Sequence, residues 1–525
     1  MEKEILKKGS NVEICETPVN DLKTEPFTIV IFGGAGDYSR RMLLPSLYHL
    51  FHDGALSGDF SIIGFGLPEM SDEEYHSFVF QSLEEFSKPP VIKDRREEFA
   101  RHINYVPSAF EDENNFRKLH SLLSKACPPN ERQKKEIIFY LAVPPPFYQL
   151  IISNIEKCNL CEEGFEPKVV IEKPFGHDQT SAVELNNIIL QSFSEGQIYR
   201  IDHYLGKETV QNIIFSRFAN SIFEPLWNRR YVSHVEITVA ENIGVEHRGA
   251  FYEWAGVMRD VIQNHMMQLI ALVAMEPPVG LQANLIRDEK VKVKVLRTIR
   301  PMNEEDIDTF MVRGQYGPGT INGNDVKGYR EEESVDPNSC IPTFFAGKFF
   351  IDNWRWSGIP FYVRTGKRLS SRTTEIIVHF TPPPLKLFGK ECDVMKPNFL
   401  TLRLQPQEEI SLNLSVKYPG IGNQPFNVTM DFNYADTFKD ERHSAHERLI
   451  LDCLKGDLTL FARQDGIEAM WQVVDPIIKR WDEISIDTFP NYSAGSWGPK
   501  ESEELMARDG LSWSDHSSFL QQQNV

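Results

Sequence analysis

A run of six apolar residues followed at once by a glycine-rich turn constrains the fold of this chain most strongly. Phe27–Phe32 reads FTIVIF, as expected for a strand buried on both faces, and residues 33–41 read GGAGDYSRR. Helical spacing of leucines follows over residues 41–51. A buried strand, a glycine turn and a helix form the start of a βαβ unit, so the sequence predicts a parallel sheet.

Strands and helices continue to alternate up to about residue 200. Further strands are predicted at residues 59–65, 137–143 and 168–172, and helices at residues 72–86 and 147–157. The pattern predicts an α/β domain with a Rossmann-like, doubly wound parallel sheet. We place this dinucleotide-binding domain at residues 26–202, after a polar N-terminal tail at residues 1–25.

The pattern changes in the second half of the chain. Apolar and polar residues alternate at 398–405 and 411–417, and 374–380 and 426–432 read similarly, as in antiparallel strands with one buried face. Residues 251–275 are expected to form one long, mostly apolar helix. Residues 203–525 are therefore predicted to form an α+β domain around a large, mostly antiparallel sheet. The family resemblance described below implies that this domain binds substrate and forms the dimer interface.

Composition excludes several functional classes. The formal net charge of −19 over 525 residues disfavours binding to nucleic acid or to an anionic membrane. The apolar stretch at 266–275 is too short to span a bilayer, and the N-terminus has no apolar leader. Seven scattered cysteines favour a reducing compartment, so we expect a cytoplasmic protein, with Cys158 and Cys161 as two unbonded thiols.

Two of the four candidate sites follow predicted strands. The glycines of residues 33–41 would let the backbone approach a pyrophosphate at a helix N-terminus. The spacing is a variant of G-x-G-x-x-G, and a purely structural tight turn is the alternative. Lys173, in the motif EKPFGHD, follows the strand at 168–172, where ligands of such folds bind. An ordinary solvated lysine is the alternative there.

The other two candidate sites lie in predicted helices. In RIDHYLGKE, His203 and Lys207 are four residues apart, so a helix would place them on one face as a phosphate clamp. A charged surface helix is the alternative. In RDVIQNH, His265 is a candidate general base or a satisfied core histidine. Asp260 lies about 140° away around an α-helix, so the carboxylate partner of His265 must come from another segment.

Together these motifs resemble the glucose-6-phosphate dehydrogenase family. GGAGD, EKPFGHD, RIDHYLGKE, RGAFYEWAGVMRDVIQNH, RTGK and LRLQP occur in the family's order, and the resemblance covers about residues 27–497. It implies oxidation of D-glucose 6-phosphate at C1 to 6-phospho-D-glucono-1,5-lactone with hydride transfer to NADP, the first step of the oxidative pentose phosphate pathway. It also implies a homodimer or homotetramer. We expect no metal.

The resemblance also assigns roles to individual residues. His265 corresponds to the general base and Asp202 to the carboxylate that orients it. The implied substrate-binding residues are Lys173, His203, Tyr204, Lys207, Glu241, Asp260, Lys367, Arg372 and Gln405. The implied cofactor-binding residues are Gly33, Gly34, Ala35, Gly36, Asp37, Tyr38, Arg40, Tyr148 and Lys173.

Some positions depart from the family pattern. Leu67 stands where an arginine usually binds the 2′-phosphate of NADP, and Tyr38 replaces a leucine. Arg40 or Arg41 would have to compensate, so use of NAD, or of both cofactors, is an alternative. Thr373 and Ile377 replace basic residues of the second NADP site of animal members, which we expect to be absent. Further alternatives are a related hexose oxidoreductase and a non-catalytic sugar-phosphate sensor.

Overall fold

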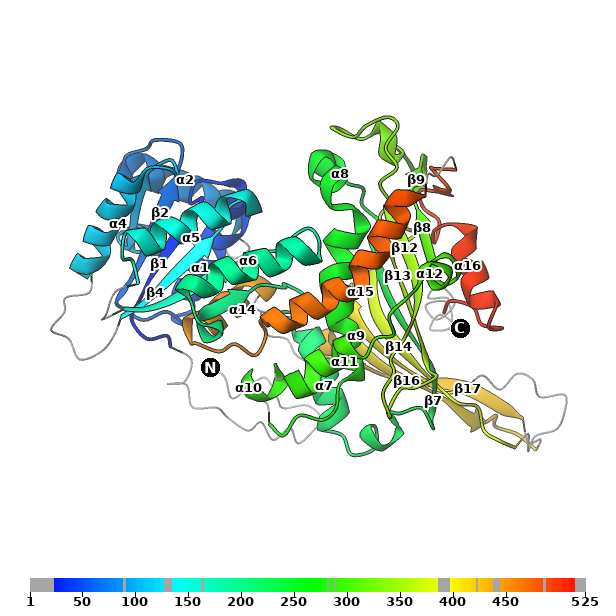
Figure 1. The fold of residues 1–525 in the computed structure, drawn as a ribbon. Coiled ribbons are helices and arrows are strands. Elements are labelled where there is room, and N and C mark those ends of the chain that lie inside the picture. Colours follow the sequence, from blue (N-terminus) through cyan, green and yellow to red (C-terminus); the bar gives the residue numbers. More distant parts are fainter. Residues whose placement is uncertain are drawn as a thin grey trace. The chain divides into compact units, whose positions relative to one another are not determined.

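The computed structural model divides into two compact units (Figure 1). The structure describes residues 23–87, 91–126, 135–161, 165–280, 283–287, 289–385, 397–421, 424–437, 444–484 and 488–514. The first unit comprises Met1–Val143, Ser153–Val169 and Ile450–Gly456, and the second comprises Pro144–Ile152, Val170–Leu449 and Asp457–Val525. Most of the predicted N-terminal tail and the cysteines at 15, 127 and 392 lie outside the described residues.

A six-stranded sheet confirms the Rossmann-like prediction. Its strand order is β3-β2-β1-β4-β5-β6, and β1 pairs in parallel with both β2 and β4. Every residue of β1 is buried, as its continuous apolar sequence predicts. The chain order reverses beside β1, and ligands of such sheets bind at the carboxyl ends of the strands around this point. The strands are β1 (Phe27–Phe32), β2 (Phe60–Gly66), β3 (Ile103–Pro107), β4 (Lys135–Leu141), β5 (Phe165–Ile171) and β6 (Ile198–Arg200).

Helices connect these strands near the predicted positions. The helix predicted at 41–51 begins with a π-helical turn, η2 (Ser39–Leu43), before α1 (Leu44–His52). Helix α2 (Asp72–Phe86) has its predicted bounds because Ser71 and Glu74 form a capping box at its start. The other helices of this half are α3 (Lys93–Ala100), α4 (Glu113–Ala126), α5 (Tyr148–Lys157) and α6 (Gln179–Ser192).

An eight-stranded sheet forms the centre of the second unit. Its order is β17-β16-β15-β14-β7-β13-β12-β8, and all described pairs are antiparallel except β13 with β7. The prediction of a large, mostly antiparallel sheet is therefore confirmed. The strands are β7 (Val232–Ala240), β8 (Met311–Gly314), β12 (Phe344–Phe350), β13 (Pro360–Gly366), β14 (Thr373–Phe380), β15 (Phe399–Gln405), β16 (Glu409–Lys417) and β17 (Pro425–Asn433).

The prediction of one continuous α-helix over residues 251–275 is wrong. The segment consists of α8 (Gly249–Val257), the π-helix η7 (Met258–Met266) and α9 (Met267–Ala274). Gly256 has φ 56° and ψ −176°, a backbone conformation that interrupts the helix and favours glycine. The apolar sequence indicated burial correctly, but burial does not distinguish an α-helix from a π-helix.

Helix α15 (Gln464–Glu483) packs against both α6 and η7 within the second unit (Figure 1). Residues 260–266 of η7 are buried as a result. Other helices of this unit are α7 (Glu208–Phe218), α10 (Ala283–Ile286), α11 (Lys294–Arg297), α12 (Glu304–Phe310) and α16 (Lys500–Ala507). No helix in the described part of the chain is both long and apolar enough to cross a membrane.

Candidate active site

The RIDHYLGKE motif forms turns rather than the predicted helix. Strand β6 ends at Arg200, and α7 begins only at Glu208, with Lys207 as its N-cap residue. Leu205 N donates to Asp202 O at 3.0 Å, and Lys207 N donates to Tyr204 O at 3.1 Å. The turn is stabilised because Asp202 Oδ1 also accepts from Tyr204 N at 2.9 Å. The residues of the predicted clamp therefore lie together, but not on one helix face.

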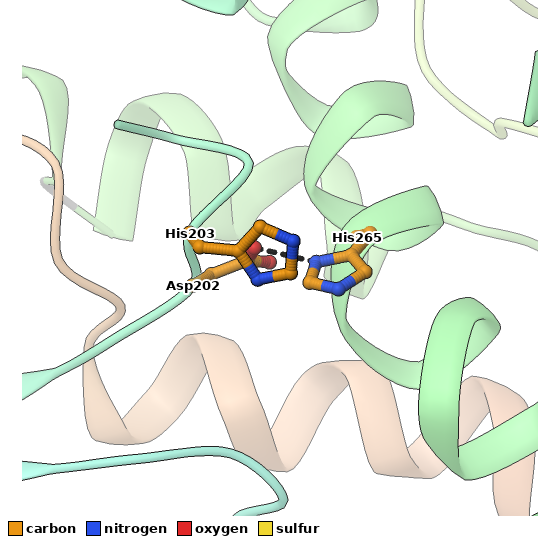
Figure 2. Close-up of side chains that lie close together, drawn as sticks. All are labelled: Asp202, His203 and His265. Carbon is orange, nitrogen blue, oxygen red and sulfur yellow. Dashed lines mark hydrogen bonds and ion pairs between the residues drawn. The ribbon is translucent and has the colours of Figure 1, made fainter. Parts of the chain in front are cut away.

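A buried Asp–His pair joins this turn to η7. His265 Nδ1 lies 2.5 Å from Asp202 Oδ1, and both residues are at most 4% exposed (Figure 2). Because the carboxylate accepts, Nδ1 donates, which leaves Nε2 as the acceptor of the neutral imidazole. The Tyr204 ring stacks on the His265 ring with centroids 4.2 Å apart, and the His203 ring lies edge-on at 4.5 Å. The imidazole therefore has a fixed orientation and tautomer.

The electrostatics of the pair favour a neutral histidine and an ionised aspartate. Burial lowers the pKa of His265 below its usual value, although the Asp202 carboxylate opposes this fall. Burial alone would raise the pKa of Asp202, but the hydrogen bond and charge of His265 hold it below its usual value. The proton therefore stays on the imidazole, and the carboxylate is available to stabilise an imidazolium.

The π-helix brings Asp260 and His265 to the same amine. Lys173 Nζ donates to Asp260 O at 3.0 Å and to Asp260 Oδ1 at 3.1 Å, and it lies 3.0 Å from His265 Nε2. The predicted separation of about 140° assumed an α-helix, whereas residues five apart are neighbours in a π-helix. Burial opposes ionisation of Asp260, but Lys173 and Lys367 hold the pKa of its carboxyl well below the usual value.

A cavity of about 170 Å³ opens onto His265 and contains most of the predicted substrate residues. Eight of the nine line it: Lys173, His203, Tyr204, Lys207, Glu241, Asp260, Arg372 and Gln405. The ninth, Lys367, lies behind the lining, with Nζ 2.5 Å from Glu241 Oε2 and 3.8 Å from Asp260 Oδ2. Our residue-level predictions omitted Arg248 and Thr374, which also line the cavity. Arg248 begins the motif RGAFYEW, so the sequence did contain a signal for it.

One end of this cavity is suited to an anion. Burial lowers the pKa of Lys207 to about 8, and the nearby Arg372 contributes to the fall. Lys207 Nζ lies 3.5 Å from the centroid of the Tyr204 ring, a cation–π contact that fixes the amine. Burial, together with His265 and Lys173, lowers the pKa of His203 well below its usual value, so its imidazole is a neutral hydrogen-bonding group. A dianion bound here would replace part of the solvation that Lys207 loses on burial.

The glycine-rich turn lies in the first unit and fits the packing that a dinucleotide-binding turn requires. Gly33 has φ +84°, and a Cβ there would lie 2.5 Å from Ala142 O. A Cβ on Gly34 would lie 2.6 Å from Gly64 Cα, so the turn approaches β2 closely. Asp37 and Tyr38 follow at the start of the helical segment, where free N–H groups favour a pyrophosphate.

Leu67 is exposed, and the two arginines expected to compensate for it both contact carboxylates. Leu67 follows β2 and is 60% exposed. Arg40 Nη2 lies 2.5 Å from Glu85 Oε2, and Arg41 Nε lies 2.7 Å from Asp37 Oδ1. Both arginines contact acidic residues in this structure. A 2′-phosphate would have to compete with these carboxylates for either guanidinium.

Two further predicted cofactor residues are tyrosines at or near the starts of helices, Tyr148 and Tyr38. Tyr148, at the start of α5, is buried and donates through its hydroxyl to Glu172 O at 3.3 Å. This bond connects α5 to the segment that carries Lys173. In the first unit, the Tyr38 and Tyr140 hydroxyls lie 3.4 Å apart, so Tyr38 uses a polar group that the usual leucine lacks.

Asp202, His203 and His265 also bring three potential metal ligands within 4.8 Å of one another (Figure 2). The hydrogen bonds above give these atoms another role, since Nδ1 of His265 binds Asp202 and an ammonium lies against Nε2. An ammonium at that position competes with a metal cation. The absence of a metal from the reaction stays a prediction.

A Rossmann-like sheet with a glycine-rich turn, and a buried Asp–His pair in a cationic cavity, define a dinucleotide-dependent dehydrogenase of an anionic substrate. Comparison with known families narrows this class. Residues 30–212 match the glucose-6-phosphate dehydrogenase NAD binding domain, and residues 214–514 match the glucose-6-phosphate dehydrogenase C-terminal domain. The chain belongs to the glucose-6-phosphate dehydrogenase family.

Individual relatives agree with this assignment over nearly the whole chain. The chain is 42% identical to glucose-6-phosphate 1-dehydrogenase of Chlamydia pneumoniae, over 93% of this chain and 96% of the relative. It is also 42% identical to the Bacillus subtilis enzyme of that name, over 92% and 97%. A solved structure of glucose-6-phosphate dehydrogenase in complex with its substrate glucose-6-phosphate matches with a TM-score of 0.84 at 32% identity, covering 94% and 99% of the two chains.

Proposed function

We propose that this chain oxidises D-glucose 6-phosphate at C1 to 6-phospho-D-glucono-1,5-lactone, with NADP as the hydride acceptor. The observation that carries the proposal is the Asp202–His265 pair at a cavity lined by the predicted phosphate and sugar ligands. A buried base beside an anion-binding end is what oxidation of a phosphorylated sugar requires. The family assignment supports the same reaction.

His265 Nε2 is the proposed proton acceptor. The C1 hydroxyl donates to Nε2, and as its proton moves to the imidazole, the C1–H bond breaks and C1–O becomes a carbonyl. A bound nicotinamide dinucleotide, for which residues 33–38 are proposed ligands, would supply the acceptor for the hydride that leaves C1. Asp202 stabilises the imidazolium that forms, and positioned general-base catalysis of this kind contributes about 10²–10⁴-fold.

Lys173 must release His265 before this step. Its ammonium lies 3.0 Å from Nε2, where a hydroxyl that donates to Nε2 would have to bind. Binding of the sugar is therefore proposed to transfer Lys173 to a substrate or cofactor oxygen, while Asp260 keeps its position. Glu241, Asp260, Lys367 and Gln405 are the proposed ligands of the sugar, and His203, Tyr204, Lys207 and Arg372 those of the phosphate.

Kinetics with glucose 6-phosphate test the function directly. We expect turnover with glucose 6-phosphate and much weaker turnover with glucose, because the phosphate ligands contribute binding energy only to the former. Equal turnover of both sugars would favour a hexose oxidoreductase without phosphate specificity. No turnover of either with both nicotinamide cofactors would favour the sensor alternative.

The choice of NADP over NAD is the finer part of the proposal. The family resemblance supports NADP, whereas Leu67 and the acidic partners of Arg40 and Arg41 favour a weak 2′-phosphate site. Parallel titrations of NADP and NAD decide between them. Leu67→Arg should raise the preference for NADP by roughly 10- to 150-fold, the equivalent of one charge-assisted hydrogen bond. An unchanged preference would place 2′-phosphate recognition elsewhere, and Leu67→Met serves as the uncharged control.

We also propose a homodimer or homotetramer with an interface on β16 and β17. Four cross-strand pairs place apolar side chains on one face: Ile410–Phe432, Leu412–Met430, Leu414–Val428 and Val416–Phe426. Met430 is 62% exposed and Phe426 is 53% exposed, and exposed apolar patches of this kind mark interaction surfaces. Met430→Glu combined with Phe426→Glu should yield monomers in sedimentation, whereas an unchanged assembly would place the interface elsewhere.

The proposed location is the cytoplasm. Cys158, Cys161, Cys340 and Cys453 are free thiols, and Cys340 is exposed. Free thiols persist in reducing compartments, which supports this location.

A further inference from the structure

Three buried polar atoms near the Asp–His pair have no hydrogen-bond partner among the described residues. They are Asp202 Oδ2, Arg200 Nε and Gln268 Oε1. Their residues are between 2% and 4% exposed, so bulk water does not reach these groups freely. Leaving a buried polar atom unsatisfied costs free energy, and buried polar groups almost always have a partner.

All three residues line one small cavity behind the pair. This cavity is distinct from the one that contains the phosphate ligands, although Lys173 contributes to both. It offers about 30 Å³ to the centre of a water-sized sphere. One ordered water needs about 10–15 Å³ by this measure and two to four polar partners. The remaining wall includes Phe175, Ile467 and Met470, so the polar atoms occupy only part of it.

The three atoms match the hydrogen-bonding capacity of a water molecule. A water has two protons to donate and can accept from a donor, and the residues that line the cavity carry two unsatisfied acceptors, Asp202 Oδ2 and Gln268 Oε1, and one unsatisfied donor, Arg200 Nε. Two of these residues are held in place by further contacts of their side chains. Arg200 Nη1 donates to both oxygens of Glu195 at 2.9 Å, and Gln268 Nε2 donates to Met470 Sδ at 3.6 Å.

We infer that one ordered water bridges Asp202 Oδ2, Arg200 and Gln268, and that Gln268 and Arg200 are positioning residues for the Asp202 carboxylate. Oδ1 alone is held directly, by His265 Nδ1 and Tyr204 N. A bond to Oδ2 prevents rotation of the carboxylate and so keeps Oδ1 directed at Nδ1. The inference rests on the proposed role of Asp202 and His265 in catalysis.

The direct test is a high-resolution crystal structure of the unmodified protein. We expect a water within hydrogen-bonding distance of Asp202 Oδ2, Arg200 Nε and Gln268 Oε1. A cavity without water at this position, at a resolution where other buried waters are defined, would overturn the inference. This measurement needs no variant, so a folding defect cannot obscure its result.

The functional test is Gln268→Leu, which removes the acceptor but keeps a similar volume. We expect kcat to fall by at least roughly tenfold, the equivalent of one lost hydrogen bond to a charged group, with KM nearly unchanged. Without Gln268 as its acceptor the water is held less firmly, and a carboxylate that loses this water as a donor attracts the His265 proton more strongly, so the acid limb of kcat/KM should move to higher pH. A loss of folding alone would lower the active fraction without moving this limb. The charged and titratable groups around the pair, which the variant leaves unchanged, are Lys173, Arg200, His203, Tyr204, Lys207, Asp260 and Lys292.

Ile467→Leu is the matched control, since it changes the apolar wall of the same cavity while conserving volume. Its kcat and pH profile should equal those of the wild type. If Gln268→Leu also equals the wild type while His265→Asn is inactive, the inference fails and the proposed function stands. If His265→Asn keeps the wild-type rate, the proposed base itself fails.

Discussion

The reactivity of single residues in this site is set by burial and by close partners of opposite charge. His265 illustrates this most clearly, since burial favours its neutral form while Asp202 favours its charged form. The neutral form is the one that can accept a proton. The site thus holds a base that is ready at neutral pH, together with a carboxylate that stabilises the product of proton transfer.

Replacement of His265 tests the base. His265→Asn should lower kcat by about 10²–10⁴-fold and leave the Kd of the substrate near that of the wild type. Because the pKa of His265 is lowered, the acid limb of kcat/KM in the wild type should lie below the usual histidine value of about 6.5. Stopped-flow and steady-state kinetics from pH 5 to 9 measure both effects. A near-wild-type rate for His265→Asn would contradict the assignment.

Lys207 provides a residue-scale prediction for specificity. Lys207→Ala should raise KM for glucose 6-phosphate by roughly 10- to 150-fold and change that for glucose little. Since the pKa of Lys207 is about 8, binding of the phosphate in the wild type should weaken as the pH rises above this value. Lys207→Arg retains the charge and serves as the control. Equal effects on both sugars would remove Lys207 from the phosphate site.

At the scale of elements, the most consequential feature is the interrupted helix that carries His265. Gly256 interrupts the helical backbone one residue before the end of α8, and the π-helical path of η7 brings Asp260 and His265 to Lys173. Apolar periodicity cannot reveal this path, because residues 260–266 are all buried and burial therefore has no period here. The position of Asp260 was therefore predicted from the resemblance and not from spacing.

Gly256→Ala tests the importance of this interruption. A Cβ at φ 56° is strained, and it would lie 3.2 Å from Ile341 Cγ2, so we expect a loss of about 1–3 kcal/mol in the free energy of unfolding. We also expect a lower kcat, because relief of the strain would shift η7. Denaturant titration and kinetics measure the two effects. Gly58→Ala, at an open position without positive φ, should change neither.

The strands show what sequence patterns predict well and where they fail. Apolar runs and alternation placed β1, β14, β15, β16 and β17 within a few residues of their observed bounds. Alternation did not reveal which face is covered: on β16 the polar Ser411 and Asn413 are buried, whereas Val416 of the apolar face is 42% exposed. Whether a face of a strand is buried depends on which distant segments of the chain pack against it. A local sequence pattern carries no information about that packing. The domain boundary at residues 202 and 203 stays a prediction.

For the site, single motifs predicted candidate residues but not their geometry. The cation cluster of RIDHYLGKE was identified for a helix that does not form, and the partner of His265 came only from the resemblance. The Asp–His pair depends on a contact between segments that are 63 residues apart, as Asp202 and His265 are. Sequence spacing carries information within one element, and this site is built from several.

At the scale of the molecule, the C-terminal segment is bound to the middle of the large sheet. Glu236, on the central strand β7, accepts from Ser514 N at 3.0 Å and Ser514 Oγ at 2.9 Å, and His379 Nε2 lies 2.6 Å from Glu236 Oε1. Asp509, in the same segment, lies 2.6 Å from Lys348 Nζ. The last described residues of the chain are therefore part of the fold that holds the site.

Glu236 gives the stability of the folded protein a predictable pH dependence. Burial alone would raise its pKa, but His234 and His379 hold the pKa of Glu236 well below its usual value. A carboxyl with a lowered folded pKa adds stability above its unfolded pKa of about 4.3 and loses it as the pH falls. Glu236→Gln should cost about 1–3 kcal/mol at pH 7, and its difference from the wild type should narrow in acid.

Urea titration of both proteins between pH 3 and 8 measures this effect. Glu111→Gln, at an exposed position, is the control and should follow the wild type. A constant difference between Glu236→Gln and the wild type at every pH would show that Glu236 is not the titrating group.

Strand β17 ends the eight-stranded sheet in the described part of the chain, and its outward residues include Phe426 and Met430. An unpaired edge with exposed apolar side chains can add another strand from any neighbouring chain. In the proposed assembly this edge is covered, so the separated subunits would be the vulnerable form of this protein. Dilution favours separated subunits by mass action, so a concentrated stock should keep its activity longer than a dilute one.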